Sequence, residues 1–123
     1  MKVTAAKNEK IGQMIFATIY PLYLNRLLKH GRTEQELKTV IQWLTGFDHA
    51  TLQNLINDKV SFKTFFEKAT MHPNAHLVKG VVCGYCIEEI PDEFALYRQC
   101  RTMEKLIDEL AKGRKMEKIL RKA

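Results

Sequence analysis

The stretch TEQELKTVIQWLTGFD, from Thr33 to Asp48, decides the fold because it contains one helix start, one helix end and a second helix start. Thr33 can accept hydrogen bonds from the N–H groups of the turn ahead of it, and Glu36 can reach back to the N–H of Thr33, which completes a capping box. Gly46 has no Cβ to resist the left-handed turn that ends a helix. Asp48 is a capping residue for the next helix, so the stretch predicts two consecutive helices.

Amphipathic patterns continue on both sides of this stretch. Apolar residues recur at helical spacing over residues 11–30, 33–45, 49–57, 61–69, 91–112 and 116–120. Pro21 lies inside the first of these segments, so we expect a kink or a break near Tyr20. Trp43 lies between Ile41 and Leu44 on the capped helix, and we expect it to be largely buried and central.

Residues 70–91 interrupt the helical pattern. His72-Pro73-Asn74 is a loop signal. The segment Val81–Ile87 is β-prone, but it follows Gly80 and contains a second glycine, so we expect at most a short extended segment or hairpin near residues 80–90. The fold class is therefore mainly α, with five to seven helices.

Length and composition indicate one domain. The chain has 123 residues, 46% hydrophobic and 28% charged, which is ordinary for a globular protein. We expect a flexible N-terminus over residues 1–10 and a single helical domain over residues 11–123. Neither an apolar run of membrane-spanning length nor a secretory signal pattern is found, and three cysteines are an odd count for a disulfide framework. These features favour a cytoplasmic protein without membrane partners.

The positive charge is concentrated at the ends of the chain. The formal net charge is +6. Residues 112–123 carry six lysines and arginines against Glu117, and residues 1–10 also carry an excess of lysine. Nucleic-acid domains usually spread such cations over one folded face with aromatic residues between them. A solvated basic tail explains the pattern better, because cations are favoured at helix C-termini.

Six short motifs resemble one bacterial family. They are Tyr20-Pro21-Leu22-Tyr23, Gly31-Arg32-Thr33, Val40–Gly46, Phe62–Phe66, Gly80–Gly84 and Asp108–Arg121. Over roughly residues 13–121 the chain resembles the family catalogued as domain of unknown function 2200. The resemblance implies a compact, mainly helical orthogonal bundle, and it implies no activity, substrate or cofactor. Cys86, His72 and His76 do not look like features of that family.

The pattern His72-x3-His76-x6-Cys83-x2-Cys86 has four nitrogen and sulfur ligands in fifteen residues, which is a possible zinc set. Pro73 disturbs any helix that would bring both histidines to one face. Structural zinc sites also more often place cysteines before histidines, with a longer spacer. We therefore expect neither a metal nor another cofactor.

Cys83 and Cys86 also have the spacing of a redox pair. The segment that follows contains Glu88 and Glu89, and nearby carboxylates raise a thiol pKa rather than lower it. Redox catalysis is therefore disfavoured.

Several polar residues are unusual in a small helical protein and suggest a pocket. Tyrosine pairs an apolar body with a polar tip, and an arginine beside a helix start can hold a carboxylate or phosphate. We expect any pocket where residues 80–90 meet the Tyr20–Pro21 kink and the Gly31–Arg32 turn. The candidate ligand-binding residues are Tyr20, Tyr23, Arg32, Cys83 and Glu88. The alternative is that Trp43 and Tyr20 belong to the core, that Arg32 is a surface residue at a turn, and that Glu88 pairs with Arg32 or with a lysine.

Function is less constrained than fold. The pattern favours a non-enzymatic binding or interaction protein and leaves enzymatic activity undecided. One alternative is a small-molecule-binding or enzymatic pocket around Tyr20, Arg32, Cys83 and Glu88. Another is binding of nucleic acid or of an acidic partner through the basic C-terminal helix.

Overall fold

The computed structural model describes residues 2–122, and in it the capped segment forms α3 (Glu34–Thr45). The Thr33 hydroxyl accepts from the Glu36 N–H at 3.2 Å, and the Glu36 carboxylate accepts from the Thr33 N–H at 3.0 Å. Gly46 ends the helix with φ of 77°. The capping box and the left-handed helix end are therefore confirmed.

Two more capped helices follow, as predicted. The Asp48 carboxylate accepts from the Thr51 N–H at 2.7 Å at the start of α4 (His49–Asn57). The Ser61 hydroxyl accepts from the Thr64 N–H at 3.2 Å at the start of α5 (Phe62–Lys68).

The N-terminal part differs from the prediction. Helix α1 spans Ala5–Gln13, where we expected a flexible segment over residues 1–10. Its order has a physical cause, because Val3 and Ile11 pack into a small apolar cluster with residues that lie far along the chain: Tyr85, Ile90 and Tyr97. Gly12 allows α1 to approach its neighbour closely, since a Cβ there would lie 2.7 Å from Cδ2 of Leu96.

Of the kink or break expected near Tyr20, the break is absent, because α2 (Phe16–Lys29) continues through Pro21. The chain breaks earlier, at Met14 and Ile15, where the extended backbone forms an antiparallel bridge to Ser61. Proline removes one hydrogen bond from α2. Burial of the Phe16, Tyr20 and Leu27 side chains along the same helix offsets that loss.

The irregular segment contains the expected hairpin. Strands β1 (Val81–Val82) and β2 (Tyr85–Cys86) pair antiparallel. The two turn residues, Cys83 and Gly84, have φ of 51° and 81°, as in the primed turns that suit two-residue hairpins. The flanking 3₁₀ helices are η1 (Ala75–Leu77), η2 (Ile87–Glu89) and η3 (Asp92–Phe94).

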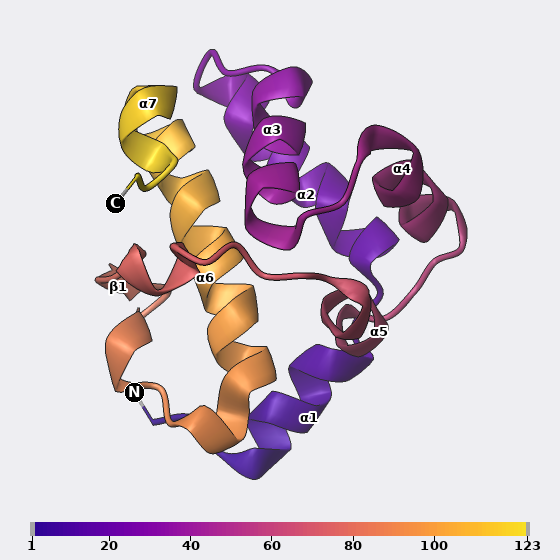
Figure 1. Cartoon of the computed structure of the whole chain (residues 1–123), viewed down its shortest axis with the longest axis vertical. Helices are drawn as coiled ribbons and strands as arrows, with labels where there is room; N and C mark the ends of the chain where they lie inside the picture. Colours follow the sequence, from indigo (N-terminus) through magenta and orange to yellow (C-terminus); the bar gives the residue numbers. More distant parts are fainter. Residues whose placement is uncertain (1, 123) are drawn as a thin grey trace.

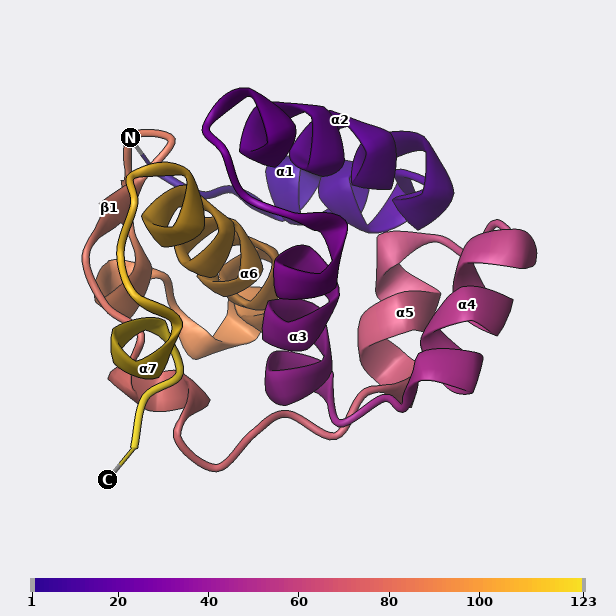
Figure 2. The same cartoon turned by 90° about the horizontal axis from the view of Figure 1, so that it is seen from above.

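Helix α6 (Ala95–Ala111) is the centre of the molecule. Figure 1 shows it running along the long axis, with the hairpin on one side and α2 and α3 on the other. Figure 2 shows α2 lying across the ends of α3, α4 and α5 rather than running parallel to them. The last helix, α7 (Met116–Ile119), packs on α6 through the fully buried Ile119. The mainly helical class with one short hairpin is confirmed.

Trp43 lies at the rim of the core rather than in its centre. Its indole is only partly buried and stacks on the His72 imidazole, with ring centroids 4.2 Å apart. The centre is formed instead by phenylalanine and aliphatic side chains, including Phe16 and Phe65, whose stacked rings lie 4.2 Å apart. The expectation that Trp43 is central is therefore wrong, although its indole packs against the core.

Candidate functional site

The structure does not gather the five predicted binding residues into one site. Tyr20 donates its hydroxyl to Glu34 at 2.9 Å, and its ring is buried in the core. Arg32 forms an ion pair with Glu36 at 2.7 Å and donates to the carbonyl of Arg114 at 3.0 Å. These contacts tie both residues to neighbouring parts of the fold.

Tyr23 and Cys83 lie near each other, beside Glu104 of α6. The Cys83 thiol donates to the Glu104 carboxylate at 3.3 Å. Burial, followed by the nearby Glu104 charge, raises the pKa of both the Tyr23 hydroxyl and the Cys83 thiol. Both groups are therefore held in their neutral forms.

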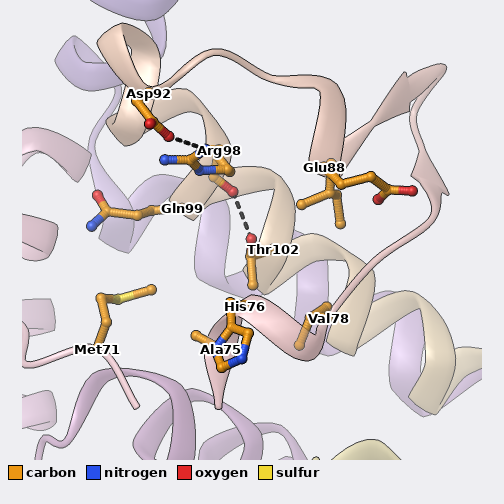
Figure 3. A pocket seen from close by; sticks show the side chains of 10 residues that line it. Met71, Ala75, His76, Val78, Glu88, Asp92, Arg98, Gln99 and Thr102 are labelled. Atoms are coloured by element: carbon orange, nitrogen blue, oxygen red, sulfur yellow. Dashed lines mark hydrogen bonds and ion pairs between the residues drawn. The ribbon is translucent and has the colours of Figure 1, made fainter. Parts of the chain in front are cut away.

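Glu88 belongs to a different face, at the edge of a cleft. Its carboxylate accepts from the Gly80 N–H at 2.9 Å, and that hydrogen bond holds its pKa below the usual range. In Figure 3 the carboxylate points away from the interior of the cleft, so its contact with Gly80 anchors the start of the hairpin.

The cleft has a volume of about 430 Å³, within the range of small-molecule sites. It lies between the η1 segment, the turns after the hairpin and α6. Its lining residues are Met71, Ala75, His76, Val78, Ile87, Glu88, Asp92, Arg98, Gln99 and Thr102. The predicted pocket was placed at the 80–90 segment, and this cleft uses Ile87 and Glu88 of that segment but neither Tyr20 nor Arg32.

Half of the six polar residues that line the cleft come from α6, namely Arg98, Gln99 and Thr102. Figure 3 shows Arg98 and Gln99 across from the η1 segment with His76 and Val78. One guanidinium nitrogen of Arg98 donates to the carbonyl of Ile90 at 3.1 Å and to the Asp92 carboxylate at 2.7 Å. The guanidinium is therefore held at the rim by two contacts from the segment that leads into α6.

The sequence pattern did not identify the cleft residues on α6 as candidates. Thr102 is buried although it is polar, and its hydroxyl donates to the carbonyl of Arg98 at 2.8 Å. In the sequence, Arg98, Gln99 and Thr102 fall between the apolar positions of an amphipathic helix, as solvent-facing residues do. The η1 segment that covers them has no periodic signal that places it there.

A second depression, larger and more open, lies between α1, α5 and α6, with a volume of about 840 Å³. Glu9, Glu67 and Glu93 are among its lining residues, together with Lys63 and Phe66. We prefer the smaller cleft as the candidate site because it is more enclosed and two of its lining residues, Val78 and Ile87, are buried apolar side chains, against Phe66 alone in the larger depression.

The histidine and cysteine pattern does not converge on a metal-like cluster. Within residues 2–122, no group of three or more His, Cys, Asp or Glu side chains is arranged to hold a metal ion. His72 stacks on Trp43 and accepts from the Asn74 N–H at 3.0 Å, whereas His76 lies at the cleft, 2.8 Å from the Pro73 carbonyl.

The cysteines have the properties of unreactive thiols. All three are free. A hydrogen bond to Glu88 and burial raise the pKa of Cys86, and burial raises the pKa of Cys100. Because the thiolate is the nucleophile, these shifts argue against redox catalysis by the Cys83–Cys86 pair.

Part of the basic C-terminal segment is structural. The Arg121 guanidinium binds both oxygens of Glu109, at 2.6 and 2.7 Å, and Arg114 pairs with the same carboxylate at 2.9 Å. Lys112 pairs with Asp108 at 3.0 Å. Half of the six cations of this segment therefore already have carboxylate partners within the fold.

The comparisons with known proteins agree with this architecture. The family described as "Uncharacterized protein conserved in bacteria (DUF2200)" matches residues 10–121. The chain belongs to this family. A solved structure titled "Crystal structure of uncharacterized protein SP1917" is similar, with a TM-score of 0.84 and 30% sequence identity over 91% of each chain. None of the curated proteins compared with the chain matches it.

Membership of the DUF2200 family confirms the resemblance seen in the short motifs. The match begins at residue 10, so it covers all the cleft residues, from Met71 to Thr102, and excludes most of α1. No helix within residues 2–122 is both long and apolar enough to cross a membrane.

Proposed function

We propose that the protein binds a small molecule in the α6 cleft, and that this ligand combines an apolar body with a carboxylate or similar anionic group. The observation that carries the proposal is the cleft itself: a space of about 430 Å³ with a buried apolar floor and an arginine fixed at its rim. Binding sites for small molecules commonly have this composition, with a few placed polar groups in apolar surroundings.

The floor supports the apolar part of the ligand. Val78 and Ile87 are almost fully buried, and Met71 and Ala75 pack against the same core while lining the cleft. Transfer of apolar ligand surface onto them is favourable by roughly 25 cal/mol per Å² of area removed from water.

Arg98 supports the anionic part. Its partner Asp92 has a side chain that is 96% exposed, so this ion pair contributes little in water and does not compete strongly with a ligand. Within the described residues, only one of the three guanidinium nitrogens makes hydrogen bonds. The remaining donors suit a two-point contact with a carboxylate.

The polar groups favour binding over catalysis. Thr102 has the one hydroxyl among the lining residues that the structure describes, and it is committed to the carbonyl of Arg98. A nucleophile needs a base within hydrogen-bonding distance, and this hydroxyl points to a carbonyl instead.

The test is a titration with aliphatic carboxylates and with the alcohols of matching chain length. Binding is measured from the chemical shifts of the backbone amides. We expect the carboxylates to shift amides around residues 75–78, 87–92 and 98–102, and the alcohols to bind about tenfold more weakly. Arg98→Gln should remove the preference for the carboxylate. Lys29→Gln, which removes one exposed cation from α2, is the matched control and should preserve it. Equal binding by wild type and Arg98→Gln would refute the proposal.

We also propose a cytoplasmic location. The three free cysteines support it, because thiols stay reduced in the cytosol. Fractionation of the native host, with the protein found outside the cytoplasmic fraction, would contradict this assignment.

A further inference from the structure

Another cavity lies where α1 meets the hairpin and α6. It has a volume of about 230 Å³. We call it the tyrosine groove, and its lining residues are Lys7, Lys10, Ile11, Met14, Tyr85, Tyr97 and Arg101. It shares no lining residue with the α6 cleft.

The groove is held together by cations placed on aromatic rings. The Arg101 guanidinium lies 5.1 Å from the ring centroid of Tyr85 and 4.8 Å from that of Tyr97. It also donates to the Tyr97 hydroxyl at 2.7 Å. The Lys7 ammonium lies 5.6 Å from the Tyr85 ring centroid and donates to the Tyr85 hydroxyl at 3.1 Å. These contacts give the groove a fixed geometry before any ligand arrives.

The charge of the groove is unbalanced. Three of its seven lining residues are cations and none is acidic. Glu104, outside the groove, pairs with Arg101 at 2.5 Å, but neither Lys7 nor Lys10 has a carboxylate partner among the described residues. Like charges gathered in one concave site attract an anion and are stabilised by it.

The Tyr85 hydroxyl lies beside these cations. It accepts from the Lys7 ammonium at 3.1 Å and is hydrogen-bonded with Tyr97. A hydroxyl that accepts can also donate its own proton, so Tyr85 is a candidate donor to a ligand. The same two hydrogen bonds, Tyr97 first, lower the pKa of Tyr85 and make its hydroxyl a better donor.

We propose that the tyrosine groove binds a single oxyanion group, a phosphate or a carboxylate, through the Lys7 and Lys10 ammonium groups and the Tyr85 hydroxyl. The groove is smaller than the roughly 300–1,000 Å³ of typical drug-sized sites, which limits it to a small group. The partly exposed Met14 and the neighbouring Ile11 form an apolar edge for the carbon atoms next to that group.

The test uses inorganic phosphate and acetate as separate probes at constant ionic strength, with binding mapped on backbone amides. We expect saturable shifts at residues 7–14, 85 and 97–101. The probe that binds more tightly identifies the chemistry. Lys10→Gln should weaken binding about tenfold, the usual effect of losing one charge-assisted hydrogen bond. Lys68→Gln removes an exposed cation from α5 and should leave the affinity unchanged.

Tyr85→Phe provides a second variant, because it keeps the buried ring and removes only the hydroxyl. It should also weaken binding, while Arg98→Gln in the α6 cleft should not. Equal weakening by Lys10→Gln and Lys68→Gln, or shifts that do not saturate, would overturn the proposal by showing only a general response to charge. The outcome is independent of whether the α6 cleft binds its own ligand.

Discussion

At the scale of single residues, the side of a helix that a residue occupies matters more than its type. Trp43 is the largest side chain of α3, yet Ile41 and Leu44 are fully buried and Trp43 lies at the rim, stacked on His72. A helical pattern identifies which side of a helix is buried. It does not show which residues of that side are only partly covered by the rest of the chain.

Trp43→Ala should therefore lower the free energy of unfolding by about 2 kcal/mol, below the 3–5 kcal/mol of a fully buried aromatic. Chemical denaturation measures the loss. Trp43→Phe, which retains a ring to stack on His72, is the control and should lose less than the alanine variant. A loss of about 4 kcal/mol or more for Trp43→Ala would place the indole in the core.

Glu109 is a residue whose role depends on two others. Its carboxylate is 8% exposed and binds both Arg114 and Arg121. Glu109→Gln leaves the 13% exposed Arg121 without its counter-charge and should destabilise the protein by about 3 kcal/mol. Glu117→Gln, an exposed change on α7, should change stability by less than about 0.5 kcal/mol. Similar thermal unfolding of the two variants would contradict this assignment.

At the scale of elements, helices with local signals were predictable and those that depend on distant contacts were not. The start and end of α3 and the starts of α4 and α5 depend on caps within three residues. Helix α1 also has a local cap, since the Thr4 hydroxyl accepts from the Lys7 N–H at 3.2 Å, but its apolar side chains Val3 and Ile11 pack in a cluster with Tyr85 and Tyr97, about eighty residues away. The continuity of α2 through Pro21 likewise depends on burial, which a proline rule does not contain.

The contact between α2 and α6 should give the stability a pH dependence. Arg26 and Lys112 bind the Asp108 carboxylate at 2.5 and 3.0 Å. Burial alone would raise the pKa of Asp108, but these two partners outweigh it and hold the pKa below the ordinary 3.8. The unfolded chain therefore binds this proton more readily. The stabilisation is present above pH 3.8 and is lost as the pH falls through the lowered folded value.

Urea denaturation of wild type and Asp108→Asn across the acid range measures this contribution. The stability difference between them should be largest at neutral pH and should shrink as the pH falls from about 3.8 through the lowered pKa of Asp108 in the folded state. A difference that stays constant over the whole range would show that the carboxylate charge is not responsible.

At the scale of the whole molecule, the candidate cleft could not be predicted because its parts meet only in the folded chain. The predicted residues Tyr20, Arg32 and Glu88 each have a local partner, and they face different parts of the fold. The cleft instead lies between α6 and the η1 segment. The spacing of residues along the chain does not show how close these two segments lie in space. The sequence placed a pocket at residues 80–90 because irregular backbone and glycines let a ligand approach, and two residues of this segment, Ile87 and Glu88, line the cleft.

The C-terminal segment packs against the rest of the fold. Ile119 is fully buried against α6, and Asn74 donates to the carbonyl of Arg121 at 3.1 Å. A variant lacking residues 114–123 should therefore unfold at a clearly lower temperature or fail to fold. Neutralising Lys115 and Lys118 together, both exposed, is the control and should leave the melting temperature unchanged. A truncated protein of wild-type stability would restore the free basic tail as a candidate for binding nucleic acid.

The central claim is that the α6 cleft holds a small molecule with an apolar body and an anionic group. A crystal structure of the protein purified from its native host, with mass spectrometry of the compounds released from the same sample, tests it most directly. The account predicts ligand density over Val78 and Ile87 with its anionic end against Arg98, and a released compound of matching mass. A well-ordered cleft that contains only solvent, in a sample that releases no compound, would contradict it.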